Sequence, residues 1–198
     1  MLNLSTYLIK EHVGLLKLTD RYDIIDPQTG RKIGFAQEKV GAVTQLFRFL
    51  VSKQMLPTAI EVREGEGENG PLVFTIKRGF SLFRSRVEVL DAGGQSLGYF
   101  KSKILTIGGG FYVFDTRDNQ VAEIKGNWVG WDFQLLDKSG KELGKVTKQW
   151  AGAAKELFTS ADNYVVALNE ELKSSPGVAT LLLAAGLAID CIYKEGRG

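Results

Sequence analysis

The sequence predicts a mainly β protein with two helices, in which a closed antiparallel barrel of about twelve strands surrounds a buried, apolar C-terminal helix. Three observations support this prediction. A hairpin unit recurs four times, other segments have strand-like composition, and one segment near the C-terminus is apolar on every helical face. So many antiparallel strands would leave unpaired edges unless the sheet closed on itself. A closed barrel of this size has a wide interior that something apolar must fill.

The recurring unit is an alternating apolar strand, an aspartate, a turn with Gly or Asn, and a second strand. Its copies are YDIIDPQTGRKIGFAQ from Tyr22, VEVLDAGGQSLGYFKS from Val87, FYVFDTRDNQVAEIKG from Phe111 and FQLLDKSGKELGKVTK from Phe133. The aspartate can bond the turn backbone, and the Gly or Asn that follows supplies the positive φ of a hairpin. The last three copies are closely spaced, so they predict a meander and argue against a parallel α/β fold.

Four further segments are rich in β-branched or aromatic residues, which predicts strands. These are Tyr7 to Val13, Thr58 to Arg63, Leu72 to Arg78 and Ala161 to Leu168. The segment from Ala42 to Val51 has apolar residues at helical spacing, and we expect it to form a helix lying against the barrel.

The second helix is expected after Pro176, at about residues 178–193. From residue 178 to residue 189, Thr180 is the only polar side chain, so the helix is apolar all round and must be buried. A membrane span needs about 20 apolar residues. This run is shorter and is followed by Asp190, which favours a helix buried in the barrel over a membrane span.

Composition indicates one ordinary globular domain over residues 1–198, because 44% of the residues are hydrophobic and 24% are charged. The net charge of +2 argues against a nucleic-acid binder. The single cysteine, Cys191, excludes an intramolecular disulfide, and the N-terminus shows no signal peptide. We therefore expect a cytoplasmic protein, with a peripheral position at a membrane as an option.

Catalytic chemistry has little support in the sequence. His12 is the only histidine, and neither it nor Cys191 has an evident catalytic partner. The glycine-rich runs at Gly65 to Gly70 and Gly108 to Gly110 lack the Lys-Ser/Thr ending and the strand-to-helix context of a phosphate loop. We expect no enzymatic activity and no catalytic residues.

A basic and aromatic stretch, KRGFSLFRSR, is the candidate lipid-binding segment. Its candidate residues are Lys77, Arg78, Phe80, Phe83, Arg84 and Arg86. Cations attract anionic headgroups, and exposed aromatic rings settle at the membrane interface. The alternative is that the phenylalanines face the core while the charges solvate the strand.

The segment from Gly144 to Leu168, GKVTKQWAGAAKELFTSADNYVVAL, contains a Lys-x-Trp-x-Gly element followed by Glu-x-Phe-Thr-x-Ala-Asp-Asn-aromatic. In these motifs it closely resembles the phospholipid scramblase family. The stretches DRYDIID, FAQE and QSLGYF and the terminal apolar helix extend the resemblance over nearly the whole chain. That family is related in fold to tubby-like and LURP-one-related proteins, which implies a twelve-stranded barrel around a central C-terminal helix.

The resemblance also implies a calcium loop that starts within FTSADN. The candidate metal ligands here are Ser160, Asp162 and Glu171. A hydroxyl replaces the first carboxylate, and calcium affinity falls as ligand charge is removed, so no cofactor is required and calcium binding would be weak. The alternative is that FTSADN caps a helix and starts a strand, with its polar side chains bonding backbone groups.

The function implied by the resemblance is non-enzymatic binding of membrane phospholipid or of a protein partner, with transbilayer movement of phospholipid as an associated activity. The sequence is compatible with two alternatives. One is a soluble barrel that carries or senses a small apolar ligand. The other is an enzyme with a cryptic carboxylate site assembled from several strands.

Overall fold

The computed structural model describes residues 1–12, 19–39, 41, 56–79, 86–103, 110–127, 130–149, 163–170 and 176–193. It contains twelve strands and the helix α2, which spans Pro176–Tyr193. The strands are β1 (Thr6–Glu11), β2 (Arg21–Ile25), β3 (Lys32–Lys39), β4 (Thr58–Glu64), β5 (Leu72–Arg78), β6 (Arg86–Asp91), β7 (Ser96–Ser102), β8 (Gly110–Phe114), β9 (Gln120–Asn127), β10 (Asp132–Asp137), β11 (Glu142–Thr147) and β12 (Asn163–Leu168). The helix expected at Ala42 to Val51 lies outside the described residues.

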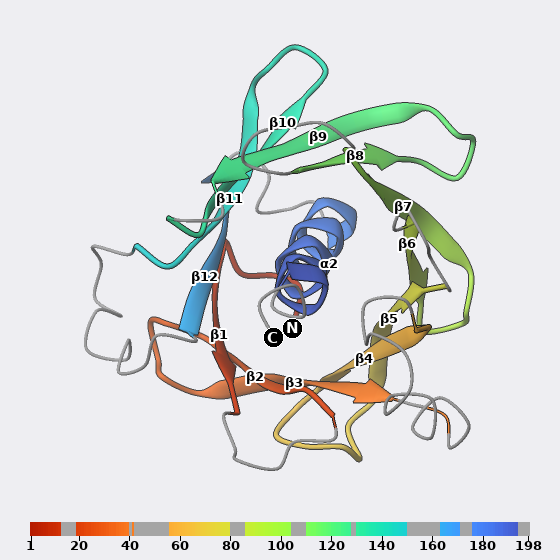
Figure 1. The fold of residues 1–198 in the computed structure, drawn as a ribbon. Coiled ribbons are helices and arrows are strands. Elements are labelled where there is room, and N and C mark those ends of the chain that lie inside the picture. Colours follow the sequence, from red (N-terminus) through yellow and green to blue (C-terminus); the bar gives the residue numbers. More distant parts are fainter. Residues whose placement is uncertain are drawn as a thin grey trace.

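The strands form a closed antiparallel barrel around α2 (Figure 1), as predicted. Each strand pairs with its neighbours in sequence, and β1 closes the barrel by pairing with β12, with Tyr7 opposite Val166 and Ile9 opposite Tyr164. Closure pairs the first strand with the last, so no edge of the sheet is left without a partner strand.

The connections alternate between the two ends of the barrel. At one end, which we call the turn end, lie the short connections after β2, β4, β6, β8 and β10. At the other end, which we call the loop end, lie the connections after β1, β3, β5, β7, β9 and β11, and each of these includes residues outside the described ranges. The helix α2 follows β12 from the turn end and runs toward the loop end.

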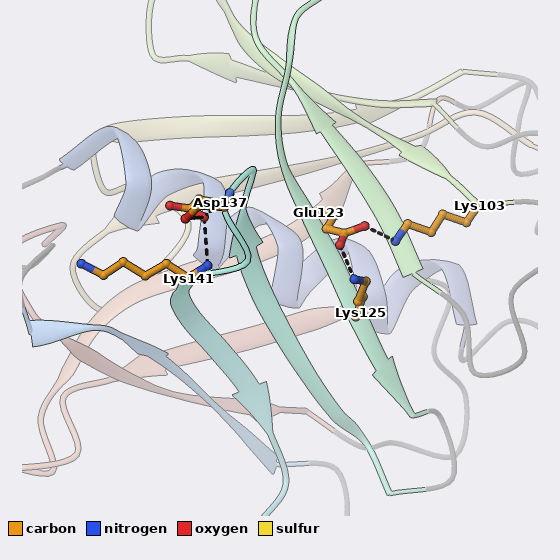
Figure 2. A network of polar contacts seen from close by, with 6 residues as sticks. Lys103, Glu123, Lys125, Asp137 and Lys141 are labelled. Atoms are coloured by element: carbon orange, nitrogen blue, oxygen red, sulfur yellow. Dashed lines mark hydrogen bonds and ion pairs between the residues drawn. The ribbon is translucent and has the colours of Figure 1, made fainter.

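The aspartates of the repeated unit organise the hairpins at the turn end. Asp137 Oδ1 accepts the backbone N–H groups of Ser139 and Lys141 at 2.7 Å and 2.9 Å, the second of which is visible in Figure 2. The same side-chain bonding occurs at Asp26, Asp91 and Asp115. These short bonds close the turns as the sequence predicted.

One turn differs in detail from the prediction. In the unit that starts at Phe111, the residue with positive φ is Asp118, at 62°, and not the Gly or Asn that the pattern suggested. Aspartate tolerates the left-handed region because its short polar side chain can bond locally. Here Asp118 Oδ1 accepts the hydroxyl of Tyr99 at 3.0 Å, which connects the turn to β7.

The turn aspartates should make the stability of the fold depend on pH in the acid range. The pKa of Asp115 is lowered by hydrogen bonds from the Asn119 side chain and backbone, and the pKa of Asp137 by bonds from the Ser139 side chain and the Lys141 backbone. When the pKa of a carboxylate is lower in the folded state than in the unfolded state, the ionised group stabilises the fold at pH values above the unfolded-state pKa. That stabilisation is lost as the pH falls through the folded-state pKa. The melting temperature should therefore fall as the pH is lowered from about 4.

The matched variant for this prediction is the double change Asp115→Asn/Asp137→Asn. Asparagine keeps an oxygen that accepts the turn N–H groups but does not titrate. In thermal melts from neutral to acid pH, the melting temperature of the variant should fall less than that of the unmodified protein. An equal fall in both proteins would mean that other carboxylates set the stability at acid pH.

The interior of the barrel is filled by α2. The side chains of Leu182, Leu183, Leu187 and Ile189 are all 1% exposed or less. They pack with inward-facing side chains of the wall in one core cluster. Because the wall surrounds the helix, every face of α2 meets apolar side chains, which explains why the sequence is apolar all round instead of along one stripe.

Two glycines let the helix approach β11 and β12 closely. A Cβ built on Gly144 of β11 would lie 2.4 Å from Leu182 Cδ2 and 2.6 Å from the carbonyl oxygen of Ala167. A Cβ built on Gly186 of α2 would lie 2.9 Å from Val166 Cγ2. Any larger residue at Gly144 would push against backbone, so glycine there fixes the distance between helix and wall.

A buried polar contact joins the helix to the wall near the loop end. The hydroxyl of Tyr22 on β2 donates to Asp190 Oδ2 on α2 at 2.8 Å. Tyr22 is fully buried and Asp190 is 3% exposed. A buried carboxyl group needs hydrogen-bond partners, so this contact helps to hold α2 at its rotation and depth in the barrel.

Candidate functional site

The outer surface of β5 to β9 at the loop end carries the clearest candidate site, which we call the basic face. It consists of five basic, two aromatic and two acidic residues. They are Lys77, Arg86, Lys101, Lys103, Lys125, Tyr99, Tyr112, Glu88 and Glu123. Strand pairing brings these residues together, although they are spread over nearly fifty positions of the sequence.

The register of the strands explains the grouping. Arg86 on β6 lies opposite Lys101 on β7, Lys101 lies opposite Tyr112 on β8, and Tyr112 lies opposite Glu123 on β9. Directly paired residues point to the same side of a sheet. In the next row of outward-facing side chains, Lys77 on β5 lies opposite Glu88 on β6. Basic side chains therefore outnumber acidic ones on one continuous surface.

Aromatic rings support the cations of the basic face. The Arg86 guanidinium lies 3.6 Å from the centroid of the Tyr99 ring, and the Lys103 ammonium lies 4.6 Å from the centroid of the Tyr112 ring. Such cation–π contacts hold the charged groups in place at the surface. Tyr112 is 36% exposed and is one of two large hydrophobic residues exposed in the described part of the chain.

Glu123 holds two lysines of the basic face, as Figure 2 shows. Its Oε2 lies 2.9 Å from Lys103 Nζ, and its Oε1 is paired with Lys125 Nζ. The hydrogen bonds from Lys125 and Lys103 lower the pKa of Glu123 below its ordinary value, against the opposing effect of burial. Glu123 is therefore ionised at neutral pH and offsets part of the positive charge.

The candidate lipid-binding residues from the sequence do not all lie on one surface of the structure. Lys77 and Arg86 are exposed on the basic face. Arg78 is 3% exposed and faces the interior, where its Nη2 donates to the carbonyl oxygen of Leu56 at 3.4 Å, so it does not join the face. Phe80, Phe83 and Arg84 lie outside the described residues, as do the candidate calcium ligands Ser160, Asp162 and Glu171.

Arg78 belongs to a polar group inside the loop end of the barrel. It lies opposite Thr58 on β4, and the Thr58 hydroxyl donates to Glu38 Oε1 at 2.5 Å. Glu38 Oε2 accepts the backbone N–H of Asp20 at 3.2 Å. These side chains are buried, and the Thr58 hydroxyl and the Asp20 N–H supply donors to the Glu38 carboxylate where the strands end.

His12 lies at the surface, directly after the end of β1. Its side chain is 42% exposed, and its Nε2 lies 2.9 Å from Asp23 Oδ1, which also pairs with Lys32 Nζ.

Trp131 is partly buried and packs on the core, while Trp128 and Trp150 lie outside the described residues.

The described ranges lack two other features that a functional site could use. They contain no group of three or more His, Cys, Asp or Glu side chains placed to hold a metal ion. Within the same ranges, no helix has the length and apolar character needed to cross a bilayer.

Comparison with known proteins identifies relatives of the chain. It is 24% identical over 201 residues to altered inheritance rate of mitochondria protein 25 of Saccharomyces cerevisiae, an alignment that covers 86% of this chain and 60% of that protein. It is 25% identical over 193 residues to a phospholipid scramblase family protein of Schizosaccharomyces pombe, covering 89% of this chain and 48% of the relative. The chain thus spans about half to three fifths of the length of these relatives. No solved structure matches it significantly.

The family model described as Scramblase matches residues 15–196, which include eleven of the twelve strands and the central helix. Because this match extends over nearly the whole barrel, the chain belongs to the scramblase family.

Proposed function

We propose that this protein binds the surface of anionic phospholipid membranes through the basic face, without catalysing a reaction. The observation that carries the proposal is the row Arg86, Lys101 and Tyr112, in which two cations and an exposed ring lie side by side across three strands. Cations near an anionic surface each contribute about 1 kcal/mol, and tyrosine rings favour the interface. Membership of the scramblase family supports phospholipid as the partner.

The charge at the turn end supports this choice of surface. Its connections, together with the strand-end residues Asp91 and Asp137, carry seven acidic and four basic residues: Asp26, Glu66, Glu68, Asp91, Asp115, Asp118 and Asp137 against Arg31, Arg117, Lys138 and Lys141. An anionic membrane repels this end and attracts the basic face. The protein should therefore meet the membrane in a defined orientation, with the outer surface of β5 to β9 at the headgroups.

We favour surface binding over transbilayer lipid movement as the activity of this fold. Moving a headgroup across a bilayer requires a polar path through hydrocarbon about 30 Å thick. Inside the barrel, α2 occupies the axis (Figure 1). Its buried side chains belong to the apolar core cluster, which offers a headgroup no such path. The same filling argues against a carrier that holds an apolar ligand in place of the helix.

The test compares two double variants that remove the same charge from different ends of the molecule. Lys77→Gln/Arg86→Gln neutralises two cations of the basic face, and Lys138→Gln/Lys141→Gln neutralises two exposed lysines in one turn at the turn end. Cosedimentation would use phosphatidylcholine vesicles with and without phosphatidylserine, each in calcium and in chelator.

We expect the basic-face variant to lose about 25-fold in partitioning to vesicles with phosphatidylserine, since each cation contributes about fivefold. The turn-end variant should bind like the unmodified protein. Equal losses in the two variants would contradict the assignment of the surface, and no binding by the unmodified protein would contradict the function itself. Binding that requires calcium would instead support the loop with Ser160, Asp162 and Glu171.

A further inference from the structure

We propose that Lys103 and Lys125 form a contact site for the phosphate of an anionic phospholipid headgroup, and that Glu123 occupies this site when the protein is away from a membrane. This inference rests on the proposed function and adds to it the position of the headgroup and a carboxylate that competes for it.

The first argument is the convergence of the two ammonium groups. Lys103 follows β7 and Lys125 lies on β9, yet both Nζ atoms contact the carboxylate of Glu123, one at each oxygen (Figure 2). A carboxylate held by two cations marks a position that favours an anion. A phosphate presents oxygens with similar spacing and can make the same two charge-assisted bonds.

The second argument is that Lys103 is held in place before any ligand arrives. Its side chain is only 6% exposed, and its ammonium lies over the Tyr112 ring. Its backbone N–H donates to the carbonyl oxygen of Gly110 at 3.1 Å. The aliphatic part of Lys103 also passes over Gly110, where a built Cβ would lie 3.5 Å from Lys103 Cδ. Little conformational freedom remains to be lost on binding.

The third argument is the contrast between the two lysines. The side chain of Lys125 is 59% exposed, whereas that of Lys103 is buried against the sheet. Lys125 can therefore turn from Glu123 toward a headgroup, while Lys103 stays fixed beside Tyr112. The exposed Tyr112 ring lies next to this pair and provides the apolar contact that an interface favours.

Glu123 has a matched control on the same surface. Glu88 lies on β6, faces the same side of the sheet, and has no ion pair with any of the residues described. The changes Glu123→Gln and Glu88→Gln add the same charge to the basic face. Only Glu123→Gln also removes the carboxylate that holds Lys103 and Lys125.

The experiment measures partitioning of the full chain to vesicles of phosphatidylcholine and phosphatidylserine in chelator, with pure phosphatidylcholine vesicles as the reference. We expect Glu88→Gln to raise partitioning by no more than about fivefold and Glu123→Gln by about 25-fold, since two lysines become available. In the double variant Glu123→Gln/Lys103→Gln, most of that gain should disappear. Thermal melts would confirm that all variants are folded.

Equal gains for Glu123→Gln and Glu88→Gln would overturn the headgroup site and leave the proposed function intact, because net charge alone would then explain binding. A gain that survives in the double variant would also overturn it. If the unmodified protein and every variant fail to bind, both the site and the proposed function are refuted.

Discussion

Replacing Leu183 by alanine should destabilise the protein by about 3–5 kcal/mol, which is the upper part of the range for large-to-small changes in a core. Leu183 lies in the middle of α2, is fully buried, and is surrounded by the wall. The barrel is closed by hydrogen bonds, so the wall has little freedom to collapse into the space that the missing side chain leaves. The free energy of unfolding from urea titrations would measure the loss.

Leu97 provides the matched comparison for this change. It lies on β7 with 37% of its surface exposed, so Leu97→Ala removes the same atoms from a position in contact with water. We expect a change within about 0.5 kcal/mol there. Similar losses at both positions would mean that α2 does not form the core in solution.

Removing the Tyr22 hydroxyl with Tyr22→Phe should cost about 1–3 kcal/mol, the range for removing one hydrogen-bond partner of a buried polar group. The variant leaves the Asp190 carboxylate buried at 3% exposure without the donor at 2.8 Å. Water reaches this position poorly and cannot replace the lost bond. Chemical denaturation would give the change in unfolding free energy.

The comparison for this prediction is Tyr99→Phe, which removes another tyrosine-to-aspartate bond. Asp118, the acceptor for Tyr99, is exposed in a turn, so water can take the place of the hydroxyl. We expect a loss of about 0.5–1.5 kcal/mol there. A double-mutant cycle of Tyr22→Phe with Asp190→Ala, which removes the acceptor, would then isolate the coupling across the barrel. A coupling energy near zero would contradict the role of this contact in holding the helix.

Local chemistry explains why so much of the barrel was predictable. The aspartates of the repeated unit close their turns within four residues, so the sequence around Asp91 or Asp137 contains nearly all the information that the hairpin needs. The helix was predictable for a different reason, because a run without polar faces has no stable place except an interior. It begins at Pro176, a residue that suits the first helical turn.

The basic face was only partly predictable because it depends on the register between strands. Lys77 and Arg86 are close in sequence to the aromatic stretch that drew attention to them. Lys101, Tyr112 and Glu123 come together through pairing of β7, β8 and β9, which no local pattern reveals. Arg78 points inward because it follows the inward-facing Phe74 and Ile76 at every second position along β5. Its inward direction was not predicted because arginine side chains are usually exposed.

The order of the chain has a consequence for biosynthesis. All twelve strands precede α2, so the 18 residues that fill the barrel leave the ribosome after the whole barrel wall. Until α2 has been synthesised, the apolar inner face of the strands has nothing to pack against. The barrel also cannot close before β12 is available to pair with β1. Contacts between such distant segments form slowly and leave apolar surface open to aggregation. A nascent chain of this fold is therefore a natural client for chaperones until the helix that fills its barrel has been synthesised.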